Sequence, residues 1–198
     1  VIGSRVQGTP EAIKETQESI VHMFQRSDAT HVSLDPTKTS MTGTGGKLVF
    51  GKVAGLWQYS MGGNWRSPEL ELNDVGFLRE TDLIRQFANL RAQFLDPTSW
   101  YRSASLRFSQ SSTYDFQGNN NRLQYDFRGE VNTINNWNFE MGLTHKPLIN
   151  INAFLRGGPR WRFSEENFMF FSVGSDDRKK LAVGAGFVKS QAQDNNFS

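Results

Sequence analysis

The chain lacks cysteine and lacks any long run of apolar residues. Without cysteine there is no disulfide, no thiolate metal site and no cysteine nucleophile. No stretch reaches the roughly 18 apolar residues that a transmembrane helix needs, so such a helix is excluded. Only 37% of the residues are hydrophobic and the mean hydropathy is −0.54. A membrane β-barrel remains compatible with these values, because only alternate residues of its strands meet lipid.

Net charge is also small. The 22 basic and 20 acidic residues leave a formal charge of +2, without a basic block, so a nucleic-acid partner has little support. The 198 residues show no linker or shift in composition, which predicts one domain over 1–198. The chain opens on VIGSRVQG, with neither an initiator Met nor a signal-peptide pattern. Either a signal peptide has been cleaved or, as we expect, this is a piece of a longer protein.

Residues that carry chemistry are sparse. The three histidines, His22, His31 and His145, form no HxH or HxxxH pair. Asp28, His31 and Asp35 in SDATHVSLD could ligate a metal on a loop, but a Ser/Asp/Thr-rich turn is the simpler explanation. No serine lies in a nucleophile-elbow frame, and the glycine clusters precede no helix. We expect a non-enzyme without catalytic residues, metal or cofactor.

What the chain does contain is alternation. In RLQYDFRGEVNTINNWNFEMGL, at 122–143, apolar and polar side chains alternate, so an extended strand would separate them onto two faces. Leu123, Tyr125, Phe127 and Val131 share one face, and the pattern then resumes at Trp137. Two environments fit this pattern: a soluble sheet with one wet face, or a membrane barrel with lipid outside and water inside.

Comparable stretches fill most of the chain. Nine segments have the strand pattern, and a tenth is possible at 1–8, whereas PEAIKETQESIVHMFQ at 10–25 is compatible with a short helix or with a strand and loop. Several of the segments exceed the roughly 5–6 residues of average soluble strands. The predicted strands are 41–53, 57–66, 83–95, 100–111, 122–133, 137–144, 149–163, 168–174 and 179–190.

The connections between these strands favour an up-and-down barrel. Tight turns are predicted at 54–55, 96–99, 134–136 and 164–167, in alternation with connections at 67–82, 112–121, 145–148 and 175–178. Outer-membrane barrels combine short turns at one end with longer loops at the other. The number of residues in three of the turns also keeps the apolar residues of adjoining strands on one face.

Four of the five tryptophans map to the predicted tight-turn end. Trp57, Trp100 and Trp137 each begin a strand after a short turn, and Trp161 precedes one. Indole favours the membrane–water boundary, so we expect these four to form an interfacial girdle. The alternative is that they are core tryptophans of a sandwich.

Polar residues of the same strands would line the lumen. A functional interpretation makes this face a path or binding surface for hydrophilic solutes. The alternative is that opposite charges on neighbouring strands pair and fill the interior. The lumen-lining candidates are Arg107, Asp126, Arg128, Glu130, Glu140, Asn150, Asn152 and Arg156.

The longest predicted connection is the candidate recognition loop. It reads ELELNDVGFLRETD at 69–82 and lies on the larger-loop side, where barrels carry recognition. A solvated acidic loop is the alternative. The candidates for contact with a partner or ligand are Glu69, Glu71, Asn73 and Asp74.

Two segments carry a family resemblance. HMFQRSDATHVSLDPTKTS at 22–40 and NWRSPELELNDVGFLRETDLIRQFANL at 64–90 resemble the C-terminal β-barrel region of a Gram-negative outer-membrane family of unknown function. Its members carry an N-terminal sandwich like carbohydrate-binding module family 9. The resemblance is close over about the first half, and Ser27 stands where the family pattern has proline. It implies an outer-membrane location and a link to glycans, and it transfers no catalytic residue.

The expected fold is therefore all-β, an antiparallel up-and-down transmembrane barrel or a large part of one. The expected function is that of a channel, transporter or surface scaffold, with the lipid bilayer and envelope proteins or glycans as partners. The competing hypothesis is a soluble carbohydrate-binding β-sandwich or lectin-like module. It predicts that Tyr125, Phe127, Trp137 and Phe139 are buried in a protein core.

Overall fold

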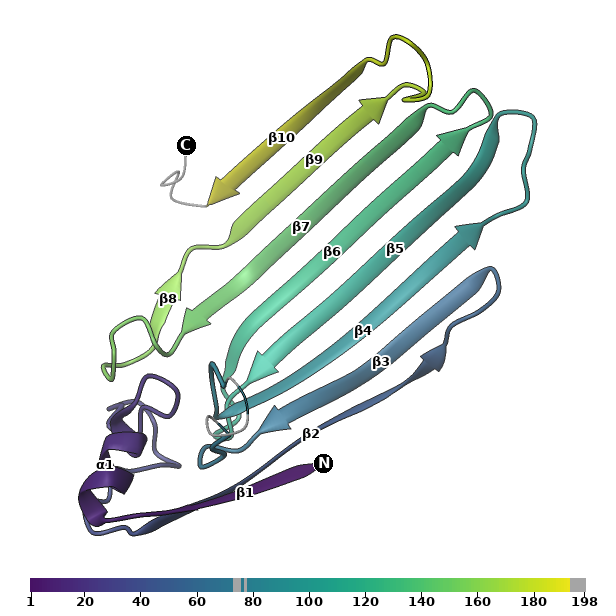
Figure 1. Cartoon of the computed structure of the whole chain (residues 1–198). Coiled ribbons are helices and arrows are strands. Elements are labelled where there is room, and N and C mark those ends of the chain that lie inside the picture. Colours follow the sequence, from purple (N-terminus) through teal and green to yellow (C-terminus); the bar gives the residue numbers. More distant parts are fainter. Residues whose placement is uncertain (73–75, 77, 193–198) are drawn as a thin grey trace.

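The computed structural model describes residues 1–72, 76 and 78–192. They form one ten-stranded sheet with a single short helix at one end (Figure 1). Neighbouring strands pair in antiparallel fashion in the order β1-β2-β3-β4-β5-β6-β7-β9-β10, and β8 also pairs with β7. The elements are β1 (Ile2–Gln7), α1 (Pro10–Glu18), β2 (Ser40–Lys52), β3 (Trp57–Arg66), β4 (Leu83–Phe94), β5 (Tyr101–Tyr114), β6 (Asn120–Thr133), β7 (Asn138–Ile151), β8 (Trp161–Phe163), β9 (Glu166–Gly174) and β10 (Gly184–Ala192).

This arrangement confirms the predicted all-β antiparallel meander. Its two edge strands, β1 and β10, lie on opposite sides of the sheet (Figure 1) and do not pair with each other. The described residues therefore form an open sheet and not the closed barrel of the expected fold. Within the described residues, no helix is long and apolar enough to cross a membrane.

The predicted strand at 149–163 is wrong. β7 runs on through Pro147 to Ile151, so the connection predicted at 145–148 does not exist. Opposite Pro147, which lacks an N–H for the ladder, the pairing of β6 with β7 shifts register between Leu123 and Tyr125. A turn over 152–160 follows, in which Gly157 has a φ of +106°.

The tight turn predicted at 164–167 is also wrong, because the chain does not reverse between β8 and β9. Both β8 and β9 pair with β7, so they continue along one edge of that strand. The chain reverses after β9 instead, at 175–183. Asn136 Nδ2 donates to Asp176 Oδ2 at 3.2 Å, which places 175–183 beside the β6–β7 turn. We call this end, with connections 53–56, 95–100, 134–137 and 175–183, the turn end, and the opposite end the α1 end.

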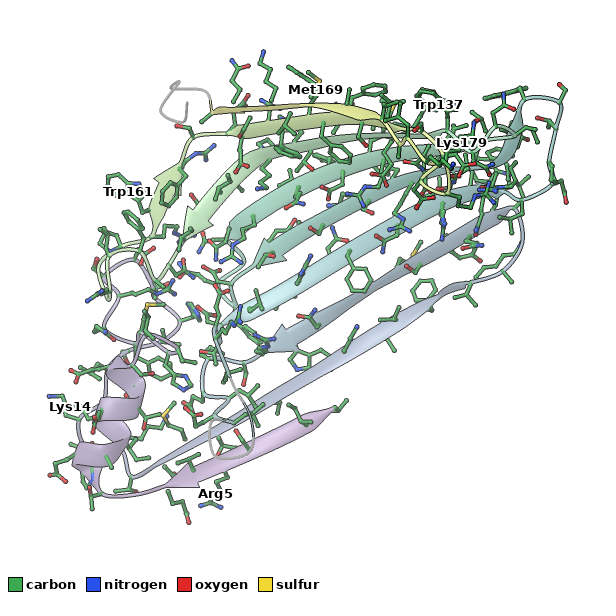
Figure 2. The ribbon with its side chains drawn as sticks, turned by 45° about the horizontal axis from the view of Figure 1, so that its top comes forward. Arg5, Lys14, Trp137, Trp161, Met169 and Lys179 are labelled. Carbon is green, nitrogen blue, oxygen red and sulfur yellow. The ribbon has the colours of Figure 1, made fainter. Side chains whose placement is uncertain are left out.

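Strand alternation divides the sheet into two faces. On the apolar face, large side chains follow one another across the strands with between 36% and 71% of their surface exposed. No second layer of described residues covers them (Figure 2). These side chains are Leu48, Phe50, Trp57, Tyr59, Met61, Leu90, Leu106, Phe108, Tyr125, Phe139, Met141, Leu143, Met169, Phe171 and Phe187. The other face, the polar face, carries most of the charged residues of the strands.

The buried core lies at the α1 end and not over the sheet. Ile13, Phe24 and Met41 form a buried cluster, against which Val6 and Val32 pack. Helix α1 begins at the predicted Pro10, and Thr9 caps it by accepting a hydrogen bond from the Ala12 backbone at 3.3 Å. The segment 19–39 that follows is held against the helix by the buried Gln17 side chain, which donates to and accepts from the Asp35 backbone, both at 2.9 Å. The α1 end is thus a small folded unit from which the long strands extend.

Candidate functional site: the polar face of the sheet

The register of the strands aligns arginines on the polar face. Arg91 of β4 lies opposite Arg107 of β5, and Arg107 lies opposite Arg128 of β6. We call these three residues the arginine row. One step toward the turn end, Glu130 lies opposite Glu140. Five lumen-lining candidates, Arg107, Asp126, Arg128, Glu130 and Glu140, therefore share one face, as predicted.

The alternative that opposite charges pair across these strands is wrong for the arginine row. None of the ion pairs within the described part of the chain includes Arg91, Arg107 or Arg128. Asp126, two residues from Arg128 on β6, instead accepts hydrogen bonds from the Thr144 hydroxyl at 2.8 Å and the Gln124 amide at 2.9 Å. The arginine row is therefore a line of positive charge without carboxylate partners.

An aromatic ring supports one member of the row. The Arg128 guanidinium carbon lies 5.3 Å from the centroid of the Phe170 ring of β9. Phe170 can lie flat there because Gly142, on the strand between, has no side chain. A Cβ at Gly142 would come within 2.1 Å of the ring. This cation–π contact leaves the polar edges of the guanidinium available to other partners.

Two hollows lie along the row and meet at Arg107. One, of about 200 Å³, is lined by Arg107 and Arg128 together with the hydroxyls of Ser109 and Thr144. The other, of about 300 Å³, is lined by Arg91 and Arg107 with further polar groups, namely Lys52, Gln58, Ser60, Asn89 and Ser109. Guanidinium groups flanked by hydroxyl and amide donors are suited to anionic oxygens.

A larger hollow of about 590 Å³ lies toward the α1 end of the polar face, and both carboxylates in its lining are paired with basic side chains. Arg122 Nη2 lies 3.3 Å from Glu80 Oε2, and Lys146 Nζ lies 3.0 Å from Glu166 Oε2. The backbone carbonyl of Glu80 also accepts a hydrogen bond from Arg66 at 3.2 Å. The carboxylates here are paired as that alternative predicted, but Arg66, Arg79 and Arg85 give the lining an excess of positive charge.

Three lumen-lining candidates are not part of this site. Asn150 is buried near the end of β7, where its amide donates to the Asn120 carbonyl at 3.3 Å. Asn152 is buried in the turn after β7, and Arg156 is exposed in that turn with a φ of +50°. They lie apart from the arginine row because the continuous strand predicted over 149–163 does not form.

The tryptophan girdle needs a similar correction. Trp57, Trp100 and Trp137 lie at the turn end, as predicted. Trp161 does not, because β8 continues along β7 without reversing; Figure 2 shows Trp161 and Trp137 at opposite ends of the sheet. The fifth tryptophan, Trp65, ends β3 at the α1 end. Tryptophans therefore lie at both ends of the strands.

The candidate recognition loop makes internal contacts where it is described. Glu69 accepts hydrogen bonds from Lys38 Nζ and from the Thr42 backbone, and Glu71 lies 2.9 Å from the imidazole of His22. Between these two residues Leu70 is fully buried. The carboxylates of Glu69 and Glu71 are thus engaged within the fold, while the other two candidates, Asn73 and Asp74, lie outside the described residues.

A charged network joins the two segments that carried the family resemblance. Arg26 Nη2 lies 3.0 Å from one Asp82 oxygen, and His31 Nε2 lies 2.8 Å from the other, with all three side chains largely buried. Because Arg26 and His31 belong to 22–40 and Asp82 to 64–90, the network and the His22–Glu71 contact fasten one segment to the other. The most distinctive part of the sequence therefore builds the α1 end.

The possible metal ligands belong to this framework. Asp28 Oδ2 accepts hydrogen bonds from the Arg160 backbone and side chain at 3.2 and 2.8 Å, and Asp35 accepts from Thr37. Burial raises the pKa of Asp28, but the hydrogen bonds from Arg160 outweigh it and leave that pKa below its usual value. Among the described residues no three potential ligands gather around a common point. The turn interpretation of SDATHVSLD is the one that these contacts support.

Arg91 is the main site residue that the sequence analysis omitted. The sequence contained enough information to place Arg91. Leu90 belongs to the apolar face, and strand alternation puts its neighbour Arg91 on the polar face. The phenylalanine beneath Arg128 was harder to find, since it depends on the register of β6, β7 and β9.

Comparison with other proteins gives one assignment. No curated protein and no solved structure matches the chain. Residues 6–198, nearly the whole chain, match the family described as a domain of unknown function, DUF5916, and the chain therefore belongs to that family.

Proposed function

We propose that this chain forms part of the wall of an outer-membrane β-barrel, with its apolar face toward lipid and its polar face toward an aqueous lumen. In this role it acts as a channel or transporter, or as a surface scaffold. The observation that carries the proposal is the broad apolar face, which has no protein layer over it.

The size of that face supports lipid as its partner. Monomeric soluble proteins rarely expose contiguous apolar patches larger than a few hundred Å², and here such side chains run from β2 to β10. They include rings as exposed as Phe50, at 58%, and Phe187, at 52%. Lipid would cover this surface, while the polar face would remain hydrated.

The tryptophans at the two ends support the same orientation. Trp57 and Trp65 lie on the apolar face of β3, eight residues apart. At about 3.3 Å per residue they are separated by about 26 Å along the strand. A strand tilt of about 40° reduces this to about 20 Å, near the roughly 25 Å apolar band of such barrels. Both residues would then lie near an interface, as in the two aromatic girdles of membrane barrels.

The unpaired outer edges of β1 and β10 support the proposal that this sheet is one part of a barrel wall. β1 and β10 each pair with a single neighbour, which leaves a row of backbone groups without ladder partners on their outer sides. Within a bilayer every such group must be satisfied, so a membrane barrel has to close. In the proposed arrangement these edges pair with each other or with further strands of the same protein.

The soluble-sandwich hypothesis makes a different prediction about the burial of four side chains. It requires Tyr125, Phe127, Trp137 and Phe139 to be buried against a second sheet. Three of them, Tyr125, Trp137 and Phe139, keep between 36% and 37% of their surface exposed, and Phe127 is only partly covered. This exposure favours the membrane hypothesis.

Membrane fractionation tests the proposal directly. The whole protein is expressed in a Gram-negative host, and its outer-membrane fraction is run on an SDS gel with and without heating. A folded barrel resists the detergent and migrates differently when unheated. Recovery in the soluble fraction, without a heat-dependent shift, would support the sandwich and direct the search toward glycan arrays.

A substitution on each face sharpens this test. Phe127→Arg places a charge on the apolar face, at an expected cost of about 2–4 kcal/mol near the middle of the bilayer, and should reduce the heat-shifted band. Gln124→Arg is the matched control, because it adds the same charge to the same strand on the polar face, beside Asp126. Equal assembly of both variants would show that Phe127 does not face lipid.

A further inference from the structure

We propose that the arginine row is an anion-binding strip on the polar face, and that within the proposed barrel it makes the pathway selective for anionic solutes. The binding claim rests on the row itself, and only the claim of selective passage rests on the proposed function. The ligand class is small oxyanions, such as phosphate or carboxylate groups.

Like charges lie opposite one another along the row. Arginines directly opposite each other on neighbouring strands repel, and a sheet without a use for them would separate or pair them. Here Arg91, Arg107 and Arg128 follow one another over three strands, and no ion pair of the described residues neutralises them. An anion lying across the row would relieve this repulsion.

One hydrogen-bond donor of the row has no partner within the described part of the fold. Nε of Arg91 is buried without a hydrogen-bond partner, and a buried polar group of this kind is costly when left unmatched. It belongs to the side chain that lines the 300 Å³ hollow with Arg107.

Neutral polar side chains surround the arginine row. Ser109 lines both hollows, and Ser60 and Asn89 add neutral polar groups beside the guanidinium groups of the 300 Å³ hollow. Asp126, the carboxylate that borders the 200 Å³ hollow, has its oxygens engaged by Gln124 and Thr144. Glu130 and Glu140 lie one step away toward the turn end, and one Glu130 oxygen accepts a hydrogen bond from Asn132 at 3.0 Å. The guanidinium groups therefore lie beside neutral hydroxyl and amide groups, and the carboxylate in the lining of the 200 Å³ hollow is already hydrogen-bonded.

Ion selectivity provides the first measurement. The whole protein is placed in a planar bilayer under a potassium chloride gradient, and the reversal potential gives the ratio of chloride to potassium permeability. We expect a ratio above one for the wild type, because rings of Arg or Lys favour anions. Arg107→Gln combined with Arg128→Gln should lower the ratio severalfold, to one or below.

Two control variants separate charge from shape. Arg5→Gln removes the same charge from an exposed position on β1, away from the row (Figure 2), and should leave the ratio unchanged. Replacing Arg107 and Arg128 by lysine keeps the charge and should retain the anion preference. A heat-dependent gel shift confirms that each variant is folded.

Calorimetric titration of the detergent-refolded protein with inorganic pyrophosphate provides a second, pore-independent measurement. Binding that is lost in the Arg107/Arg128→Gln variant and kept in Arg5→Gln supports the strip, even if the bilayer shows no conductance; in that case the channel proposal fails and the strip stands. Equal or absent pyrophosphate binding in wild type and double variant overturns the strip. Conductance whose ratio does not change in the double variant overturns the claim of selective passage.

Discussion

At the residue scale, buried charges at the α1 end determine how the connecting segments are held. Asp82 accepts hydrogen bonds from Arg26 and His31, both in the segment after α1, and from the backbone N–H of Phe116 after β5. Its own φ of +54° lies in the left-handed region, which aspartate and asparagine tolerate better than most residues. One carboxylate therefore fastens three parts of the chain.

Replacing this carboxylate should be costly. Asp82→Asn keeps a side chain that tolerates the backbone conformation but leaves Arg26 buried without its counter-charge, and we expect a loss of about 3–5 kcal/mol in unfolding free energy. Urea unfolding of the detergent-refolded protein measures it. Asp177→Asn, an exposed position at the turn end, is the control. A loss below that range in Asp82→Asn would show that the network contributes little.

A second residue-scale prediction concerns pH. The pKa of Asp28 is lower in the folded chain than its ordinary value of 3.8, so the carboxylate stabilises the fold above that value, and this contribution is lost as pH falls through the folded pKa. We expect the difference in unfolding free energy between pH 6 and pH 3 to be smaller in Asp28→Asn than in the wild type. Asp96→Asn, at an exposed turn, should leave that difference as it is. An unchanged difference in Asp28→Asn would refute the role.

At the element scale, a glycine lets the 67–82 connection cross β2. The backbone of Leu70 lies so close to Gly43 that a Cβ there would come within 2.2 Å of the Leu70 nitrogen. The neighbouring strand offers a contrast, since a Cβ at Gly3 would have its nearest neighbour at 3.8 Å. The same substitution should therefore act differently on β1 and β2.

We expect Gly43→Ala to lower the unfolding free energy by about 1–3 kcal/mol, because the loop must move away from β2. Gly3→Ala should change it by less than about 0.5 kcal/mol, as a surface substitution away from special features does. Protease susceptibility of the 67–82 connection gives an independent measurement. If the two variants unfold alike, the loop does not pack on β2 as described.

At the scale of the whole molecule, the proposal orients the strands across a bilayer. Trp57, Trp100 and Trp137 would mark one interface, and Trp65 and Trp161 the other. Variants that retain either Trp57 or Trp65 as their one tryptophan test this arrangement in lipid vesicles. We expect both to be quenched more strongly by labels near the headgroups than by labels at the bilayer centre.

The two tryptophans should also respond to opposite sides of the membrane. An aqueous quencher added outside the vesicles should reach one variant preferentially, and the same quencher enclosed inside should reach the other. A second pair, retaining Trp137 or Trp161 alone, should behave in the same way. If Trp57 and Trp65 respond to the same side, the strands do not span the bilayer as proposed.

Much of the meander was predictable because strand alternation is a local property. The faces of β3 to β7 follow from which side chains are apolar. Alternation alone predicts that Arg107, Asp126 and Arg128 lie on the polar face, where the structure has them. The helix was one of two alternatives for 10–25, and it forms over Pro10–Glu18 with Thr9 as its cap. These features depend on neighbours in the sequence, whose effects the sequence displays directly.

The sequence by itself determined the all-β class, the two chemically opposite faces and most of the residues on each. Tertiary structure decided that Pro147 does not end β7 and that β8 continues beside it, which moved Trp161 to the other end. It also decided that Arg26, His31 and Asp82 meet, and that Arg91, Arg107 and Arg128 stand in one row. The physical reason is that such juxtapositions depend on register and on contacts between distant segments, whereas alternation within a strand depends only on the chain's own geometry.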